Sequence, residues 1–282
     1  MTSPTVAIVT GANRGIGKAI AQTLAHSFKG PLVLYATSRK GLDMKFPTAS
    51  ETKVKYPILD IADSTSIRDF AQTIKKDHDA VDVLINNAGV NADDEYSPEH
   101  VRLTLDTNVR GTLLMCQTFI PLLRKTGRIV NVSSTASSLN NYDGEIRNRF
   151  RSSDMTFDGL EKLMQEYQKW IVFDLYEQQS ANEGTESQHG WPPRAYSVSK
   201  ACVNALTAVL ARENQGLVIN ACCPGWVDTD MGTMVGSRPP KDQADGAKIP
   251  LRLGFGNIGN VTGRYWGNPS IADTGDGQVM EW

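Results

Sequence analysis

The chain has 282 residues, with 29 Lys and Arg against 31 Asp and Glu and a formal net charge of −2. These balanced, interspersed charges give no reason to expect nucleic acid or an anionic membrane as a partner. No apolar run approaches the roughly 20 residues of a membrane span, and the four cysteines lack metal-ligand spacing. We therefore expect a cytoplasmic protein with reduced thiols and no metal site, long enough for one large α/β domain or two small ones.

Short β-branched runs alternate with amphipathic segments along the chain. Residues 5–9 form the first such run, and apolar side chains recur after it at helical spacing, at Ile16, Ile20, Leu24 and Phe28. The pattern predicts further strands over 31–39, 55–61, 81–89, 127–134 and 217–225, with a possible last strand at 262–266. It predicts further helices over 66–77, 99–126 and 197–215. Continuous apolar strands between helices predict a doubly wound parallel α/β sheet, covered on both faces.

One segment, from about 139 to 191, interrupts this alternation. Within it, residues 158–179 begin with Asp158 and Glu161 at capping-box spacing, which predicts a helix. The apolar side chains of this helix fall on one stripe, at Leu160, Leu163, Met164, Tyr167, Ile171 and Leu175. The polar flanks are predicted to be loop or surface, over 140–154 and 180–190. The segment is thus predicted to be an inserted helical unit.

Glycines stand at 11, 15 and 17 in "TGANRGIG", between a predicted strand and a predicted helix. Gly11 permits a tight exit from the strand, Gly15 lets the backbone approach a pyrophosphate, and Gly17 allows close helix packing. The amino end of the helix then faces the anion. Because the strand and helix that this pattern requires are both predicted, the turn indicates a dinucleotide site rather than a merely structural turn.

The end of the next predicted strand, "YATSRKG", bears on which nicotinamide cofactor binds. An acidic residue there would bind the ribose 2′-hydroxyl, but this chain has Ser38 and Arg39 instead. The guanidinium of Arg39 suits a 2′-phosphate, and Arg14 in the glycine turn offers a second guanidinium. Arg39 could also be an ordinary solvated loop charge, yet the two arginines together favour NADPH. Asp60, after the strand predicted over 55–61, is a candidate for the adenine amino group.

Tyr196 and Lys200 stand four residues apart in "YSVSK", a spacing that puts both side chains on one face of a helix. Such a pair is either an ordinary surface pair or a proton donor beside a cation. In the second case the ammonium of Lys200 would lower the pKa of the Tyr196 phenol. The spacing by itself does not decide between these two interpretations.

Six motifs in a fixed order carry a resemblance, namely "TGANRGIG" at 10–17, "NNAG" at 86–89, "TNVRGT" at 107–112, "NVSS" at 131–134, "YSVSK" at 196–200 and "NACCPGWVDTDM" at 220–231. Through them the chain resembles the short-chain dehydrogenase/reductase family, and more closely its NADPH-dependent carbonyl reductases. The resemblance implies a single Rossmann-type domain over 1–282. It also implies that the insertion at about 139–191 covers the helices through which other members oligomerise, and hence a monomer.

The resemblance implies a catalytic set of Asn108, Ser134, Tyr196 and Lys200, with Ser134 preferred over its neighbour Ser133. If its helix is broken locally, Asn108 could hold a water that relays protons to Lys200. Besides the residues of the glycine turn and the phosphate site, the resemblance implies cofactor contacts at Asn13, Ile16, Ile61, Asn87, Ala88, Gly89, Tyr196, Lys200, Pro224, Gly225, Val227 and Thr229. The substrate is expected to contact Ser134, Tyr196 and Trp226, with Trp191 and Met231 as further candidates for the pocket.

The function expected from these residues is NADPH-dependent reduction of aldehydes, ketones or quinones to alcohols, with Tyr196 as proton donor. Two alternatives remain at this point. One is an NADP-dependent alcohol dehydrogenase that acts on a dedicated metabolite. The other is a dinucleotide-sensing protein without catalysis, which an incomplete catalytic set would favour.

Overall fold

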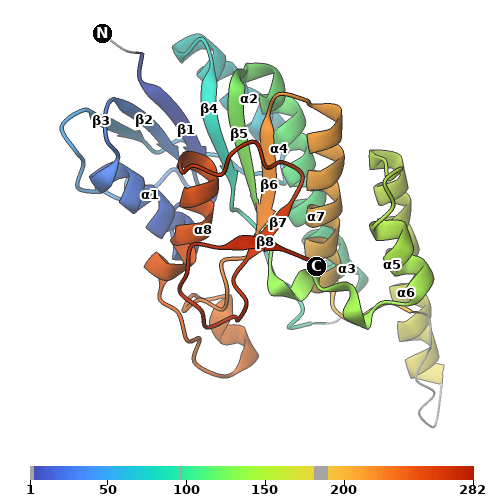
Figure 1. Ribbon diagram of the computed structural model, residues 1–282. Coiled ribbons are helices and arrows are strands. Elements are labelled where there is room, and N and C mark those ends of the chain that lie inside the picture. The colour runs from blue at the N-terminus through green and yellow to red at the C-terminus, as the bar shows by residue number, and fades with distance from the viewer. Residues whose placement is uncertain (1–2, 96, 181–189) are drawn as a thin grey trace.

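The computed structural model describes residues 3–95, 97–180 and 190–282. The described strands form one eight-stranded sheet in the order β3-β2-β1-β4-β5-β6-β7-β8 (Figure 1). Neighbouring strands are parallel except for β7 and β8, which are antiparallel. The strands are β1 Thr5–Val9, β2 Leu32–Ala36, β3 Thr52–Lys55, β4 Val81–Asn86, β5 Leu123–Val132, β6 Val218–Cys222, β7 Tyr265–Gly267 and β8 Gln278–Met280. The predicted doubly wound sheet is confirmed.

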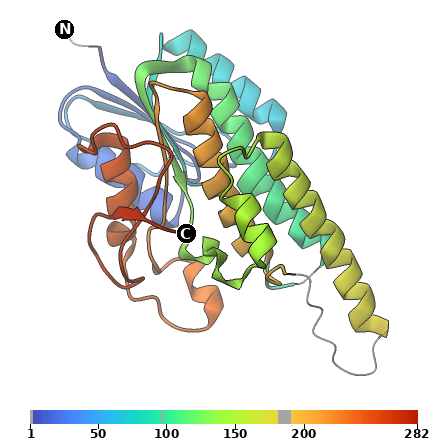
Figure 2. The ribbon, with the colours of Figure 1, turned by 45° about the vertical axis from the view of Figure 1, so that its right-hand side comes forward.

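Helices cover both faces of this sheet (Figures 1 and 2). The helices are α1 Gly15–Ser27, α2 Ser64–Asp77, α3 Pro98–Leu105, α4 Thr112–Phe119, α5 Gly144–Phe150, α6 Phe157–Ser180, α7 Ala195–Glu213 and α8 Gln243–Phe255. Alternate residues of β1 show how the core divides, since successive side chains of a strand point to opposite faces. Val6 and Ile8 pack with α2, α4 and α7, whereas Ala7 and Val9 pack with α1 and α8.

Strand β3 ends at Lys55, so the prediction of a strand over 55–61 is wrong beyond its first residue. Pro57 lacks an N–H and cannot donate to a ladder, which makes a regular strand unfavourable there. Only an isolated bridge between Ser38 and Ile58 continues the pairing. The Ile58 side chain is 66% exposed, so it lies outside the core that the apolar run suggested.

The helix predicted over 99–126 is interrupted and also ends early. A π-helical turn, Asp106–Gly111, separates α3 from α4. A short 3-10 turn that contains Pro121 then ends the helical segment, and β5 begins at Leu123. Proline cannot supply the N–H of a continuing helix, which accounts for the early end.

The insertion contains α6, as predicted, and also α5, which was predicted to be loop. The interpretation of 140–154 as loop missed Tyr142, Ile146 and Phe150, which recur every four residues and are all buried. The predicted stripe on α6 is buried at Leu160, Leu163, Met164, Tyr167 and Ile171, whereas the side chain of Leu175 and residues 181–189 lie outside what the structure describes. The helix begins one residue before Asp158, and the hydroxyl of Thr156 accepts from Gly159 N at 3.0 Å.

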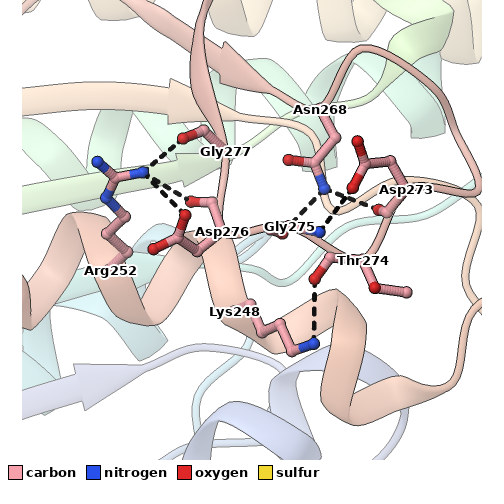
Figure 3. A network of polar contacts seen from close by, with 8 residues as sticks. All are labelled: Lys248, Arg252, Asn268, Asp273, Thr274, Gly275, Asp276 and Gly277. Carbon is pink, nitrogen blue, oxygen red and sulfur yellow. Dashed lines mark hydrogen bonds and ion pairs between the residues drawn. The ribbon is translucent and has the colours of Figure 1, made fainter.

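The last part of the chain contains α8 and β8, which the sequence pattern did not predict. The loop between β7 and β8 is fastened to α8, where Lys248 Nζ donates to Thr274 O at 3.0 Å and Arg252 forms an ion pair with Asp276 at 3.1 Å (Figure 3). The chain then crosses to the insertion, because the backbone carbonyl of Trp282 accepts from Arg151 at 2.8 Å. The carboxyl-terminal segment therefore connects α8 with α5.

Candidate active site

The glycine turn lies between β1 and α1, and its backbone requires glycine at two positions. Gly11 has φ +65° and Gly15 φ +55°, both in the left-handed region that favours glycine. A Cβ on Gly17 would lie 2.3 Å from Asn87 Nδ2 and 2.4 Å from the Gly11 carbonyl oxygen. Among the described residues no side chain caps α1, and its first turn has no acidic residue. Its free N–H groups thus make a site suited to a pyrophosphate.

The turn at 87–89 is bonded directly to the glycine turn. The hydroxyl of Thr10 accepts from Asn87 N at 3.0 Å and from Ala88 N at 2.9 Å. In return, Asn87 Nδ2 donates to the Thr10 carbonyl at 2.9 Å. Thr10 is not among the predicted site residues, although its hydroxyl stands at the last position before the glycine turn. The two predicted cofactor turns therefore lie side by side at the carboxyl edge of the sheet.

The residues predicted to select NADPH lie at the end of β2 and in the glycine turn. Ser38 is 5% exposed, and its hydroxyl has no hydrogen-bond partner among the described residues. Arg39 is exposed, whereas Arg14 donates to Asp230 at 2.8 Å in an exposed ion pair. An exposed pair contributes only about 0–1 kcal/mol, so a phosphate can replace Asp230 as the partner of Arg14. A free buried hydroxyl beside an exposed guanidinium fits a 2′-phosphate.

The other predicted cofactor residues lie around this edge. Asp60 Oδ1 accepts from Ala62 N at 3.0 Å, which fixes the loop before α2. The Ile61 side chain is buried. Thr229 Cγ2 lies 3.2 Å from the position of a Cβ on Gly15, so the loop after β6 meets the glycine turn. In that loop, Gly225 has φ +86° and Trp226 Nε1 donates to the Gly232 carbonyl at 2.8 Å.

Tyr196 and Lys200 lie in the first two turns of α7, beside the end of β5. Lys200 is 5% exposed, and its Nζ donates to the Val132 carbonyl at 2.8 Å and lies 5.5 Å from the centroid of the Tyr196 ring. Ser134 follows β5 by two residues, and its side chain faces the Tyr196 phenol closely enough to lower the pKa of that phenol. The structure thus brings together Ser134, Tyr196 and Lys200 from two segments about 60 residues apart.

The two neighbouring serines have different surroundings. Ser133 is 2% exposed, and its hydroxyl donates to the Lys200 carbonyl at 3.2 Å inside the core. Ser134 is partly exposed, and its own carbonyl accepts from the hydroxyls of Ser137 at 2.6 Å and Tyr265 at 3.3 Å. Ser134 is therefore the more accessible of the two serines. Tyr265 is not among the predicted site residues, because no local pattern links β7 to this loop.

Asn108 lies in the π-helical turn, so the helix is interrupted at the position that a water relay would require. Its Oδ1 accepts from Val90 N, and its Nδ2 donates to Val90 O, both at 2.8 Å. Nδ2 also donates to the Ser199 hydroxyl at 2.9 Å. Both amide hydrogens are therefore used, and a relay water would have to bind the Asn108 backbone carbonyl instead. The side chain joins the loop after β4 to α7.

Burial dominates the electrostatics of the predicted catalytic pair. Desolvation raises the pKa of Tyr196, and the hydrogen bond from Ser134 opposes that effect. Lys200 is not among the groups that shift the pKa of Tyr196, so the predicted lowering by its ammonium is not found. Desolvation also lowers the pKa of Lys200 to about 8. The fraction of Lys200 that carries a positive charge therefore falls as the pH rises through about 8. The protonated phenol is thus the favoured form of Tyr196.

The two tryptophans predicted near the substrate lie in different parts of the structure. Trp226 is partly buried on the loop after β6. Trp191 instead packs within the insertion, with ring centroids 5.3 Å from Tyr167, 6.0 Å from Tyr142 and 6.2 Å from Phe150. Trp191 therefore helps to hold α5 and α6 together. Within the part of the chain that the structure describes, no group of His, Cys, Asp and Glu side chains could hold a metal ion.

Replacing Gly17 with alanine tests the close contact beneath the glycine turn. The new Cβ would overlap Asn87 and Gly11, so we expect a loss of about 1–3 kcal/mol in unfolding free energy. We also expect dinucleotide affinity to fall about tenfold or more, which corresponds to about 1.4 kcal/mol. Denaturant unfolding and NADPH titration would measure both effects. Gly144→Ala is the control, because nothing lies within 4 Å of a Cβ there; equal behaviour of the two variants would contradict the prediction.

Comparison with known proteins gives the same classification. A short chain dehydrogenase model matches residues 5–146, and an enoyl-(acyl carrier protein) reductase model matches residues 160–262. Carbonyl reductase (NADPH) 1 of Sus scrofa is 36% identical, with 88% of this chain and 86% of that protein covered. The protein of that name in Homo sapiens is 35% identical, with 88% and 90% covered.

Two solved structures have related folds. Menthone neomenthol reductase from Mentha piperita has a TM-score of 0.73 at 27% identity, covering 94% of this chain and 99% of that one. NADPH-bound carbonyl reductase from chicken fatty liver has a TM-score of 0.66 at 25% identity, covering both chains fully. The matches in sequence and fold extend over most of the chain. The glycine turn and the meeting of Tyr196, Lys200 and Ser134 agree with these matches. The chain belongs to the short chain dehydrogenase family.

Proposed function

We propose that this protein is an NADPH-dependent carbonyl reductase that converts small aldehydes, ketones or quinones to alcohols. The observation that carries the proposal is the meeting of Ser134, Tyr196 and Lys200 at the carboxyl edge of the sheet. This edge also carries the glycine turn, so a bound dinucleotide and a carbonyl oxygen would share one site. The names and identities of the curated relatives support the same activity.

Each residue of the proposed site has a separate task. NADPH, when bound, supplies the hydride that reduces the carbonyl carbon. Ser134 donates a hydrogen bond to the carbonyl oxygen, where negative charge develops. Tyr196 gives its phenolic proton to that oxygen, and the ammonium of Lys200 stabilises the phenolate left behind. Asn108 holds the loop after β4 against α7 through its bonds to Val90 and Ser199.

Tyr196 carries its proton at neutral pH, which is the form that reduction requires at its start. A proton donor must carry its proton at the working pH, and burial raises the pKa of Tyr196. Oxidation of a dedicated alcohol would instead need the phenolate as base. The assembled site also argues against a protein that only senses the dinucleotide, since binding alone does not require a buried lysine beside a tyrosine.

We further propose that the protein works as a cytosolic monomer with one domain over 1–282. The apolar stripe of α6 belongs to the same core cluster as the apolar residues of α2, α4 and α7, which supports a single domain. Helix α6 contacts α3 and α7, so the insertion at about 139–191 covers that side of the molecule (Figure 2). No helix among the described residues is long and apolar enough to cross a membrane.

Light scattering during gel filtration tests the oligomeric state. We expect the mass of one chain across a range of protein concentrations, because α5 and α6 pack against α7 and α6 also contacts α3. A stable dimer at the lowest concentration would contradict the monomer proposal. That result would leave the proposed reaction intact.

Replacing Tyr196 with phenylalanine tests the proton donor. NADPH oxidation is measured with a quinone of the menadione type and with an aryl aldehyde. We expect turnover to fall by about 10²–10⁴-fold, because general acid catalysis contributes that much, whereas NADPH binding persists. Tyr142→Phe removes the same atom from the buried insertion and serves as control. Retained turnover would remove Tyr196 from the mechanism, and a wild type inactive toward a broad carbonyl panel would contradict the proposed function.

Replacing Arg39 with aspartate tests the 2′-phosphate site. The carboxylate would repel the phosphate and accept from a ribose hydroxyl, so we expect kcat/KM to shift from NADPH toward NADH. A tenfold loss with NADPH would correspond to about 1.4 kcal/mol of binding energy. Lys29→Asp makes the same charge change just after α1, at the opposite edge of the sheet, and is the control. An unchanged preference in the Arg39 variant would argue against its role.

A further inference from the structure

Asp93 lies in the loop after β4 and bonds to the first turn of the helix that carries Tyr196. The Tyr196 backbone N–H lies 3.2 Å from Asp93 Oδ1 and 3.4 Å from Oδ2. The N–H of Ala195 also faces this carboxylate and helps to lower its pKa. These are the first two residues of α7, whose N–H groups have no partner within the helix. Arg194, at the capping position, makes no side-chain cap. Asp93 therefore caps α7 from another element.

The loop that presents Asp93 is itself fastened. Asp93 N donates to Asn91 Oδ1 at 3.1 Å. Just before it, both backbone groups of Val90 are bonded to the Asn108 side chain. The carboxylate is partly buried and is held by the chain on both sides, so it is not a mobile surface charge. Its position relative to α7 is fixed by the fold.

The backbone of Tyr196 is consequently held at both of its polar groups. Its N–H donates to Asp93, and its carbonyl accepts from the Ser199 hydroxyl at 2.7 Å. Ser199 in turn accepts from Asn108 Nδ2 at 2.9 Å. Because the backbone of Tyr196 is held at both groups, the position of its side chain relative to Ser134 is restricted. Small displacements of a catalytic group cost much of its effect.

We propose that Asp93 is a positioning residue for carbonyl reduction: its carboxylate fixes the first turn of α7 and so places the Tyr196 hydroxyl beside Ser134. The inference rests on the proposed role of Tyr196 as proton donor. It adds a residue from the loop after β4 that none of the six sequence motifs contains.

The charge of Asp93 has a second effect on Tyr196. Burial is the main cause of the raised pKa of the phenol, and Cys223 and, least of all, the Asp93 carboxylate raise it further. The charged groups that face Asp93 are Arg194, which favours the carboxylate, and Asp94, which disfavours it. Burial itself raises the pKa of Asp93, and the two helix N–H groups lower it. Removing the charge would lower the pKa of Tyr196.

Three variants distinguish the hydrogen bonds by which Asp93 caps α7 from the effect of its negative charge. Asp93→Ala removes both, Asp93→Asn keeps an acceptor oxygen without the charge, and Asp94→Asn neutralises the exposed neighbour as control. For Asp93→Ala we expect kcat to fall about tenfold or more while the Kd for NADPH stays within about twofold. For Asp93→Asn we expect kcat within about threefold of wild type, with the alkaline limb of the kcat/KM profile moved to lower pH. Asp94→Asn should match wild type.

A direct titration completes the test without using turnover. The ultraviolet absorbance of tyrosinate, taken as the difference from Tyr196→Phe, reports the pKa of Tyr196. This pKa should be lower in Asp93→Asn than in wild type, and it can be read even if Asp93→Ala does not fold. Wild-type kcat in Asp93→Ala, or a kcat in Asp93→Asn as low as in Asp93→Ala, would overturn the positioning role of Asp93, and an unmoved titration in Asp93→Asn would overturn the effect of its charge. A wild type without carbonyl-dependent NADPH oxidation would instead overturn the proposed function.

Discussion

The burial of the Lys200 ammonium at the end of β5 is the constraint on which the rest of the site depends. Its Nζ donates to the Val132 carbonyl at 2.8 Å, and a buried charge needs such a partner. This bond holds α7 against the last residue of β5. Tyr196 lies one helical turn before Lys200, and Ser134 lies two residues after Val132. Once the lysine is in place, the phenol and the serine hydroxyl must lie beside each other.

A set of buried amides keeps α7 in that register on the sheet. Asn131 Nδ2 donates to the Thr207 hydroxyl at 2.9 Å, and Asn131 Oδ1 accepts from Asn86 at 2.9 Å. Nearer the site, Asn204 Nδ2 donates to Ser137 at 2.9 Å. An unpaired buried polar group costs about 1–3 kcal/mol, so any sliding of the helix would be unfavourable. The network therefore specifies one position of α7.

A helix or strand was predictable where its own residues carried a regular apolar pattern. The predictions were wrong where contacts with other segments determine the local structure. Alternating apolar runs and helical spacing located most strands and helices. The run at 55–61 failed because pairing with β2, not apolar character, decides where β3 ends. Helix α5 was missed, although Tyr142, Ile146 and Phe150 recur every four residues, because they stand in a polar stretch and their burial depends on distant segments such as α7 and Trp282. These outcomes depend on contacts that a local window does not contain.

The sequence by itself determined the chemistry that the site offers. The glycine spacing, the absence of an acid near Arg39 and the four-residue step from Tyr196 to Lys200 are all local facts of the chain. The family resemblance already favoured Ser134 over Ser133, but only the tertiary structure decided that Thr10 and Asp93 hold the turns around the site. These residues act through partners up to about 100 positions away, and no local period encodes such a distance.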